Sequence, residues 1–305
     1  MVKNRVLIIY LDMRSSLNKA DLVASKMPEL DLLAEIVTLP LCMDPNVSQL
    51  ECWQAVNETI YKNYDRYDGF IIVGKADNLI YSAVAADTAF AKNYKPIIFT
   101  TAILSGGGFK FKKLSDLSLK TNLINALQLI NSGISDIMIV YGQKAVLATL
   151  ARKKSVSQLN SYDSLTGEYI ATADFSIELH VKPEKKSKYV VFVNKFDDDL
   201  ALLYLHPGFV WDKYKDILKN SRALIIKSMY SDGLLDVNIK WLHQNFKDKP
   251  IIIYNRLGIF REKALPDNYM ISKQMSWETM IVRTMWCLGK TKTTVGFKKI
   301  FFPKV

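Results

Sequence analysis

Short apolar runs rich in β-branched residues recur along this chain and alternate with longer amphipathic segments. The apolar runs cover residues 6–11, 69–74, 95–101, 136–142, 201–208, 223–228 and 250–255. Continuous apolar runs of this length are typical of strands that are covered on both faces of a sheet. Helical periodicity lies between them, at residues 49–64, 79–93, 119–131, 211–219, 238–246 and 277–288. This alternation predicts an α/β protein whose sheet is mostly parallel, with right-handed crossovers.

The length of the chain and a break in this rhythm predict two domains. With 305 residues, the chain exceeds the size of roughly 250 to 300 residues at which a single hydrophobic core stops growing. The rhythm breaks between Phe175 and Phe196, around the polar, proline-bearing segment PEKKSK at 183–188. We therefore predict a larger N-terminal domain at 1–182, a linker at 183–196 and a smaller C-terminal domain at 197–305.

The composition narrows the classes of function. Hydrophobic residues make up 49% of the chain and charged residues 23%, which indicates a globular protein rather than a disordered one. Lys and Arg number 41 against 30 acidic residues, so the formal charge is +11, and a nucleic-acid partner has to be considered. The basic residues are scattered, with short clusters at 185–188 and 290–304. A solvated lysine-rich surface is therefore favoured over a dedicated nucleic-acid site.

The cysteines, histidines and N-terminal segment bear on the cell compartment. Cys42, Cys52 and Cys287 are widely spaced without a CxxC motif, and the histidines lack a helical i, i+4 spacing. This pattern favours neither a disulfide framework nor a zinc site. The apolar run at 6–11 is too short for a secretory signal, and no stretch reaches the roughly 20 apolar residues that span a bilayer. We expect a reduced, cytoplasmic protein that binds no metal and does not cross a membrane.

Polar residues that follow the predicted strands are the candidates for a site, because ligands of an open parallel sheet bind beyond the carboxyl ends of its strands. Asp77 and Lys154 each follow a strand, where they form either an acid–base pair in one cleft or a solvated surface pair. Ser15 and Ser16 follow the first strand and supply either an exposed nucleophile or a helix cap. The residues alone therefore indicate an α/β protein with a crevice.

The segment YDRYDGFIIVGKADNLIYSA at 64–83 resembles the YDGFVVLHGTDTMAYTA stretch of the type I, or cytoplasmic, L-asparaginases. Further collinear segments are similar to that family: KPIIFTTA at 95–102, LSD at 114–116 with NLINAL at 122–127, LYLHPGF at 203–209 and MSWETMIVRTMWCLGKT at 275–291. The resemblance covers essentially the whole chain. It implies an asparaginase-like fold, with a larger N-terminal parallel-sheet domain and a smaller C-terminal α/β domain. It also implies no cofactor, and assembly as a homodimer or homotetramer.

The same resemblance places unusual residues at the family's catalytic positions. Arg14 falls on the attacking threonine of the family's TGGTIG loop, and a guanidinium group has no nucleophilic character. Ala76 falls on the second threonine, in the HGTDT loop, whereas Asp77 and Lys154 keep the aspartate and the lysine of the relay. Asp44, Pro45 and Asn46 replace the substrate-holding DSS, and Gly233 replaces an asparagine that a neighbouring subunit supplies.

The resemblance therefore implies an asparaginase homologue that is inactive or strongly impaired, a pseudoenzyme. Arg14, Asp44, Asn46 and Ala76 then belong to a site for a small amino-acid or carboxylate ligand or for a partner subunit. If Asp77 and Lys154 persist as a buried ion pair, removal of either partner is expected to destabilise the domain by about 3 to 5 kcal/mol.

Two alternatives remain. The first is an active amidohydrolase that releases ammonia from asparagine, with Ser15 or Ser16 as a relocated nucleophile and Lys154 as the base. The second, prompted by the basic charge, is the asparaginase-like subunit of archaeal tRNA-dependent amidotransferases. That subunit relies on the threonine loops that are replaced here, so it is the less favoured of the two.

Overall fold

The structure is a computed structural model, and it describes residues 3–11, 27–42, 44, 46–101, 109–155, 161–173, 176–182, 189–229, 234–254, 265–272 and 275–302, with side chains of 109–116 left aside. The chain divides into two compact units, Met1–Asn194 and Lys195–Val305. The boundary between the units falls inside the segment 183–196 that we predicted as a linker. Each unit is an α/β structure with its own sheet.

The sheet of the first unit is 8-stranded, in the order β11-β10-β7-β6-β5-β3-β1-β2. Its parallel part contains β1 (Arg5–Leu11), β2 (Glu35–Leu41), β3 (Gly69–Val73), β5 (Ile97–Thr100) and β6 (Ile137–Tyr141). The antiparallel strands β7 (Lys144–Leu147), β10 (Ala171–Ala173) and β11 (Ile177–Leu179) continue it beyond β6. The predicted parallel α/β sheet is thus confirmed, and the antiparallel edge is an addition.

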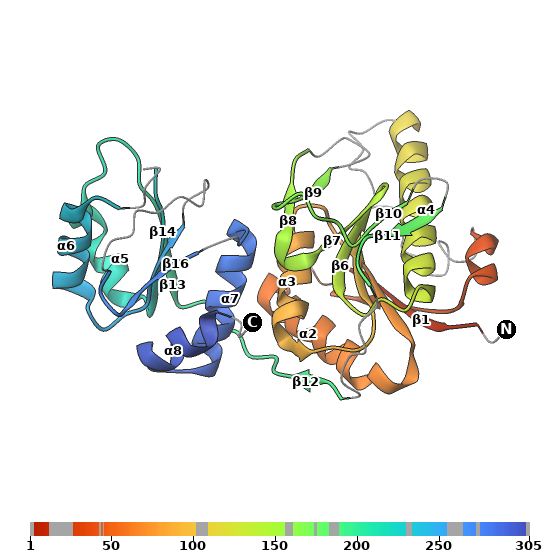
Figure 1. Ribbon diagram of the computed structural model, residues 1–305, viewed down its shortest axis with the longest axis horizontal. Coiled ribbons are helices and arrows are strands. Elements are labelled where there is room, and N and C mark those ends of the chain that lie inside the picture. Colours follow the sequence, from red (N-terminus) through yellow and green to blue (C-terminus); the bar gives the residue numbers. More distant parts are fainter. Residues whose placement is uncertain are drawn as a thin grey trace. The chain divides into compact units, whose positions relative to one another are not determined.

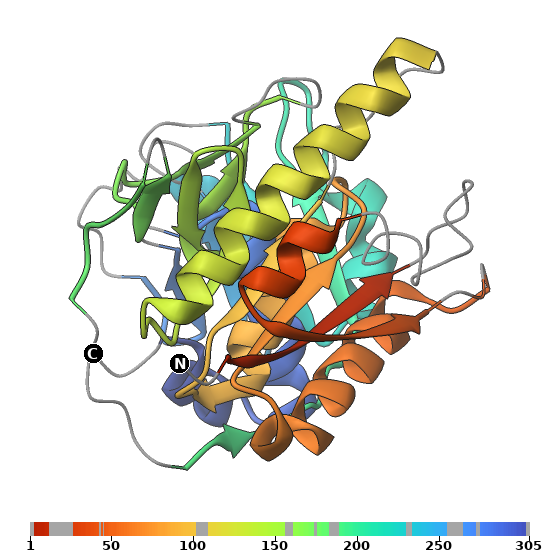
Figure 2. The same ribbon diagram turned by 90° about the vertical axis from the view of Figure 1, so that its right-hand side faces the viewer.

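Helices cover both faces of this sheet, which is why its central strands β3, β5 and β6 are buried at every position and almost entirely apolar. Figures 1 and 2 show α4 (Phe109–Asn131) and the short helix η1 (Pro28–Leu32) on one face, and α2 (Gln49–Lys62) and α3 (Leu79–Ala89) on the other. Ile8 and Leu123 belong to the buried cluster under α4. Successive side chains of a strand point to opposite faces, so both sets of alternate residues are buried.

Smaller elements complete the first unit. They are η2 (Tyr64–Arg66), η3 (Ala148–Leu150), the antiparallel pair β8 (Ala151–Lys153) and β9 (Tyr162–Ser164), and the antiparallel pair β4 (Phe90–Lys92) and β12 (Val191–Phe192). Strand β12 lies within the predicted linker, and its pairing with β4 joins it to the first unit.

The second unit contains a four-stranded parallel sheet in the order β13-β14-β15-β16. Its strands are β13 (Leu200–Tyr204), β14 (Ala223–Lys227), β15 (Ile251–Tyr254) and β16 (Tyr269–Ile271). Its helices are η4 (Trp211–Tyr214), α5 (Lys215–Asn220), α6 (Asp236–Phe246), α7 (Trp277–Lys290) and α8 (Thr294–Phe301). Leu218 of α5 and Leu242 of α6 pack with Ile226 and Ile253 in one buried cluster. Among the described helices of either unit, none is both long and apolar enough to cross a bilayer.

Candidate functional site

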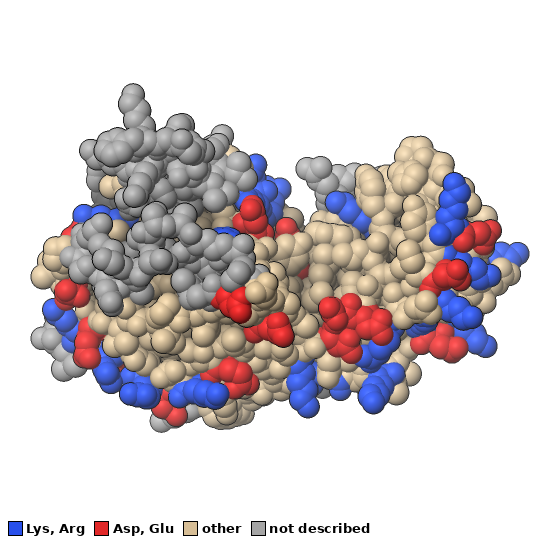
Figure 3. Space-filling view, turned by 180° about the vertical axis from the view of Figure 1, so that it is seen from behind, with Lys and Arg blue, Asp and Glu red and all other residues tan. Residues whose placement is uncertain are grey.

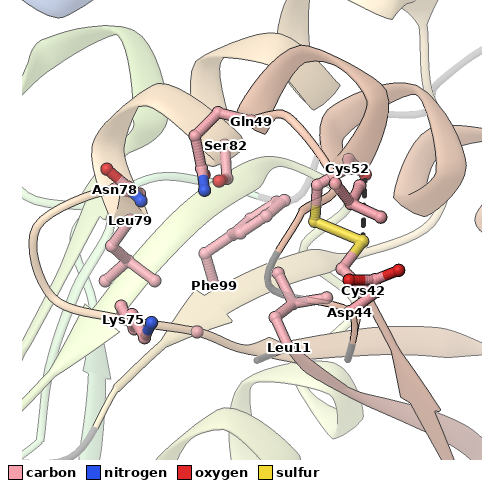
Figure 4. Close-up of a pocket in the computed structure, with 12 residues that line it drawn as sticks. Leu11, Cys42, Asp44, Gln49, Cys52, Lys75, Asn78, Leu79, Ser82 and Phe99 are labelled. Atoms are coloured by element: carbon pink, nitrogen blue, oxygen red, sulfur yellow. Dashed lines mark hydrogen bonds between the residues drawn. A yellow bond between two sulfur atoms is a disulfide. The ribbon is translucent and has the colours of Figure 1, made fainter. Parts of the chain in front are cut away.

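A cavity of about 60 Å³ lies in the first unit, beyond the carboxyl ends of the parallel strands. Leu11 at the end of β1, Gly74 just after β3 and Phe99 of β5 form its floor. This is the position at which open parallel sheets bind ligands. Figure 4 shows the side chains that converge on the cavity from the strands and from the helices that follow them.

The polar part of the lining comes from the first turns of α2 and α3 and from the loops before them. Gln49 belongs to α2, Ser82 to α3, and Lys75 and Asn78 to the loop between β3 and α3. Figure 4 shows the ammonium group of Lys75 and the amides of Gln49 and Asn78 at this cavity. An ammonium group, amides and a hydroxyl are groups that hydrogen-bond a carboxylate or an amide.

Local hydrogen bonds fix the loop that leads into α2. Asp44 lines the cavity, and its Oδ1 accepts the backbone N–H of Asn46 at 2.8 Å. Ser48 caps the helix: its Oγ accepts the N–H of Glu51 at 3.2 Å, and the Glu51 carboxylate accepts the N–H of Ser48 at 2.9 Å. This reciprocal capping box explains where α2 begins. Hydrogen bonds from the backbone and side chain of Ser48 also lower the pKa of Glu51.

The cysteines of this loop correct one of our expectations. The structure records a disulfide between Cys42 and Cys52, whose Cα atoms lie 5.7 Å apart. Both residues line the cavity (Figure 4). The prediction of fully reduced cysteines is therefore wrong for this pair. A sequence separation of 10 residues does not predict a bridge, because it is the fold that turns the end of β2 back toward the start of α2.

The predicted pair of Asp77 and Lys154 is also wrong. Asp77 Oδ1 lies 2.7 Å from the Nζ atom of Lys153, the preceding residue, and the Asp77 side chain is 73% exposed. Lys154 instead forms an ion pair with Asp163. The pair at Asp77 is therefore a largely solvated surface pair, so the large loss of stability that we expected for a buried pair does not apply.

Strand alternation gives the physical reason for this shift by one residue. Lys153 lies opposite Tyr162 in the β8–β9 ladder, and Arg152 lies opposite Asp163. Neighbouring residues of a strand point to opposite faces, so Lys153 is directed toward Asp77 while Arg152 and Lys154 are directed toward Asp163. The Tyr162 hydroxyl, on the same face as Lys153, donates to the carbonyl of Ala76 at 2.7 Å.

Asp163 is the most heavily paired carboxylate among the described residues of this region. Its side chain is 6% exposed and forms ion pairs with Lys144, Arg152 and Lys154, and the hydroxyl of Tyr169 donates to it. Burial by itself raises the pKa of Asp163. The hydrogen bonds from Lys154, Tyr169, Lys144 and Arg152 outweigh burial and hold this pKa well below its usual range. Asp163 is therefore an anionic anchor for the β8–β9 hairpin.

Of the remaining predicted site residues, two lie in loops beside the cavity and four lie outside the described residues. Ala76 is buried just after β3, and Asn46 is exposed in the loop before α2. Arg14, Ser15, Ser16 and Gly233 lie outside the described residues. The structure thus brings Ala76, Asp77 and Lys153 together through the Tyr162 and Lys153 contacts, and it places Asp44 at the cavity.

Sequence reasoning missed several of the residues that line the cavity. Gln49 and Ser82 lie in the first turns of helices that were correctly predicted, and a search of the helix starts would have found them. Lys75 lies in the same strand-to-helix loop as Asp77, but no motif singled it out. Cys42 and Cys52 were visible only as two cysteines on either side of a predicted helix start.

Comparisons with known proteins agree with this geometry. Residues 12–186 match the family model described as "Asparaginase, N-terminal". An L-asparaginase of Thermococcus kodakarensis is 22% identical over 278 residues, which are 85% of this chain and 81% of that protein. L-asparaginase 1 of Escherichia coli K12 is 26% identical over 220 residues, which are 70% of this chain and 63% of that protein.

A solved structure shows the same fold over the full length. The crystal structure of L-asparaginase I from Vibrio cholerae superposes with a TM-score of 0.83 at 19% identity, and covers 100% of this chain and 98% of that one. At this level of identity the structural likeness establishes the fold. Because the family model covers more than half of the sequence, the chain belongs to the asparaginase family and is homologous to the type I L-asparaginases.

Proposed function

We propose that this chain is an asparaginase-family protein that has lost amide hydrolysis, or retains it at a strongly reduced rate, and binds a small amino acid or other small carboxylate in the cavity of its first unit. The proposal combines family membership with the chemistry of the residues beyond β3 and β8. It applies to a cytoplasmic homodimer or homotetramer, which light scattering tests by a mass of two or four chains.

The observation that carries the loss of hydrolysis is the environment of Asp77. The preceding residue, Ala76, is 6% exposed and has a methyl group where the family resemblance places a hydroxyl. Among the described residues, the hydrogen-bond partner of the Asp77 carboxylate is Lys153, at 2.7 Å. No hydroxyl group of the described residues hydrogen-bonds to the Asp77 carboxylate, so this part of the chain offers the pair no nucleophile to activate.

The magnitude of the expected loss follows from how such groups work together. Catalytic residues of one relay act as a unit, so removal of one member costs nearly as much as removal of all. Loss of a nucleophile from a hydrolase typically lowers kcat by about 10⁴- to 10⁶-fold. Retention of Asp77 and of a lysine nearby is therefore compatible with a kcat lowered by about that factor.

The polar lining supports a carboxylate-bearing ligand. Lys75 supplies a positive charge, and Gln49 and Asn78 supply amides that bind both oxygens and N–H groups. These side chains come from the helix starts of α2 and α3 and from the loop between β3 and α3. The lining therefore favours a small ligand that carries a carboxylate.

Hydrolysis is tested by measuring ammonia release from L-asparagine and L-glutamine with the purified full-length protein. We expect no turnover above the rate of the Asp77→Ala variant. The alternative function, an amidohydrolase with Ser15 or Ser16 as nucleophile, predicts turnover that disappears in Asp77→Ala and in the double variant Ser15→Ala/Ser16→Ala. Turnover of that kind would refute the loss of hydrolysis.

Binding is tested by thermal shift with L-aspartate, L-asparagine and succinate. A ligand that binds only the folded chain at 100 times its Kd adds about 2.7 kcal/mol of stability. We expect a shift for at least one of them, and a smaller shift in Lys75→Gln. Lys62→Gln is the matched control, because Lys62 is exposed at the far end of α2. Equal shifts in both variants would exclude this cavity as the binding site.

A further inference from the structure

The Cys42–Cys52 bridge joins two walls of the cavity. Cys42 follows β2 at its carboxyl end, and Cys52 lies at the end of the first turn of α2. Their Cα atoms are 5.7 Å apart, within the range of about 4.4 to 6.8 Å that a disulfide spans without backbone movement. Both residues line the cavity, and Figure 4 shows the sulfur–sulfur bond at its edge.

The bridge closes a short loop that carries part of the cavity wall. This loop contains Asp44, which lines the cavity, and Ser48, which caps α2. Cys42 has a φ of 55°, the left-handed region that non-glycine residues rarely adopt. The fold has to hold this turn against its intrinsic preference, and a covalent link from the same residue to the start of α2 does so.

Reactivity is confined to this pair. Cys42 is half-buried and Cys52 is buried, so Cys42 is the more accessible cysteine of the pair. Cys52 lies near the N-terminus of a 14-residue helix, where the helix dipole stabilises negative charge such as that of a leaving thiolate. The third cysteine, Cys287, is fully buried, and burial raises the pKa of its thiol to about 12. Cys287 therefore stays a neutral, inaccessible thiol.

From these observations we propose that Cys42 and Cys52 form a thiol–disulfide exchange site for low-molecular-weight thiols and their disulfides, and that the redox state of the pair controls how firmly the cavity wall is held. A thiolate RS⁻ attacks one sulfur of the bridge, forms a mixed disulfide and releases the other sulfur as a thiolate. A second RSH displaces the first as RSSR. In total, two RSH molecules are oxidised to RSSR, and the two electrons and two protons that they lose convert the protein disulfide into two thiols. An excess of RSSR drives the reverse reaction.

The two states differ in the order of the loop. With the bridge closed, the turn at Cys42 and the first turn of α2 are tied together, and Asp44 stays at the cavity. With the bridge open, the left-handed turn at Cys42 is free to relax, and the loop gains conformational entropy. The oxidised protein therefore presents the preorganised cavity. Tighter binding of a small carboxylate in this state rests on the proposed function.

The exchange site is tested by counting thiols in the full-length protein equilibrated in glutathione buffers of different ratio. In the reduced native protein, two thiols are expected to react with a maleimide. In the oxidised native protein, no thiol is expected to react. Unfolding exposes Cys287 and is expected to add one reactive thiol in either state. The Cys287→Ser variant serves as the matched control and keeps the native counts. A pair that never closes at high oxidised glutathione, or never opens at high reduced glutathione, overturns the proposal.

The change in the cavity wall is tested by hydrogen exchange of peptides that cover residues 42–58. Reduction is expected to raise exchange there by at least tenfold and to leave β14 of the second unit unchanged. The Cys42→Ser/Cys52→Ser variant should match the reduced protein in both buffers. If the unmodified protein shows equal hydrogen exchange at residues 42–58 in both redox states, the redox state does not control the order of the cavity wall.

A thermal shift with L-aspartate in both states separates this inference from the proposed function. A larger shift in the oxidised protein supports both. Thiol counts and exchange that respond to redox state, with no shift in either state, refute aspartate as the ligand and leave the exchange site standing. An equal shift in both states refutes redox control of binding.

Discussion

At the scale of single residues, Asp163 forms more ion pairs than any other carboxylate in the described part of the first unit. Its side chain is 6% exposed and is paired with Lys144, Arg152 and Lys154, which are themselves partly exposed. Such a carboxylate pays for its burial with several charge-assisted hydrogen bonds, each worth about 1.5 to 3 kcal/mol. The cations remain hydrated when the carboxylate is removed, so the loss is smaller than for a fully buried pair.

Asp163→Asn is therefore expected to lower the free energy of unfolding by about 2 kcal/mol at pH 7. The folded-state pKa of Asp163 is lower than the unfolded value of about 3.9, so its contribution is complete above pH 5 and is lost as the pH falls below about 4. Urea denaturation at pH 7 and pH 3 measures both values. The difference between the variant and the unmodified protein should shrink at pH 3.

Asp77→Asn is the matched control, because Asp77 is 73% exposed in its pair with Lys153. An exposed pair contributes about 0 to 1 kcal/mol. A larger effect for Asp77→Asn than for Asp163→Asn would contradict the assignment of Asp163 as the anchor of the β8–β9 hairpin.

At the scale of elements, the start of α2 depends on its capping box. Ser48→Ala removes the side-chain acceptor for the N–H of Glu51 and is expected to cost about 1 kcal/mol of stability. It also removes the Ser48 side-chain hydrogen bond to the Glu51 carboxylate, so the pKa of Glu51 should rise toward its ordinary value. Denaturation and NMR titration of Glu51 measure the two effects. Ser48→Thr, which keeps the hydroxyl, should change neither.

Helix α7 passes very close to the backbone of the same unit at Gly289. A Cβ atom added there would lie 2.5 Å from the carbonyl oxygen of Lys195 and 2.9 Å from the nitrogen of Phe196. In an exposed helix, Gly→Ala usually stabilises by about 1 kcal/mol. Here we expect Gly289→Ala to destabilise by about 1 to 3 kcal/mol, because backbone atoms have to move. A lower urea midpoint for Gly289→Ala supports the backbone clash, and a higher midpoint supports the gain in helix propensity.

At the scale of the whole molecule, the chain has 41 basic and 30 acidic residues, and the basic residues are scattered along the sequence. On the face shown in Figure 3, Lys and Arg side chains lie interspersed with Asp and Glu over the described residues. Such a distribution gives weak, screened attraction to polyanions rather than a site that neutralises many phosphates at once. The basic charge is thus a property of the surface and does not by itself indicate a nucleic-acid partner.

We therefore expect tRNA binding that is weak at 50 mM salt and not measurable at 200 mM salt in filter-binding or anisotropy experiments. A dedicated site that contacts 6 to 10 phosphates would bind tightly at 50 mM salt and would lose about 10³- to 10⁵-fold in affinity between 50 mM and 200 mM salt. Tight binding at 50 mM salt with that steep dependence would revive the amidotransferase-like alternative.

The larger features of the fold were predictable because they depend on patterns that each segment carries by itself. The central strands are buried on both faces and therefore read as continuous apolar runs. Strand β2 was missed because it lies at the edge of the sheet, is half-exposed and contains Pro40, a residue that edge strands tolerate. The short strands β8 to β11 are too brief to show a period.

Local periodicity and collinear segments were enough to predict the α/β class, the order of the main strands and helices along the chain, and the asparaginase relationship. Two contacts became visible only in three dimensions: Lys153, rather than Lys154, contacts Asp77, which is 76 residues away in the sequence, and Cys42 contacts Cys52. For the cysteines the cause is the turn that brings the end of β2 back to the start of α2. For Asp77 the cause is strand alternation, since adjacent side chains point to opposite faces and a one-residue uncertainty in register exchanges the partners. Contacts between distant segments depend on that register, which no single segment encodes.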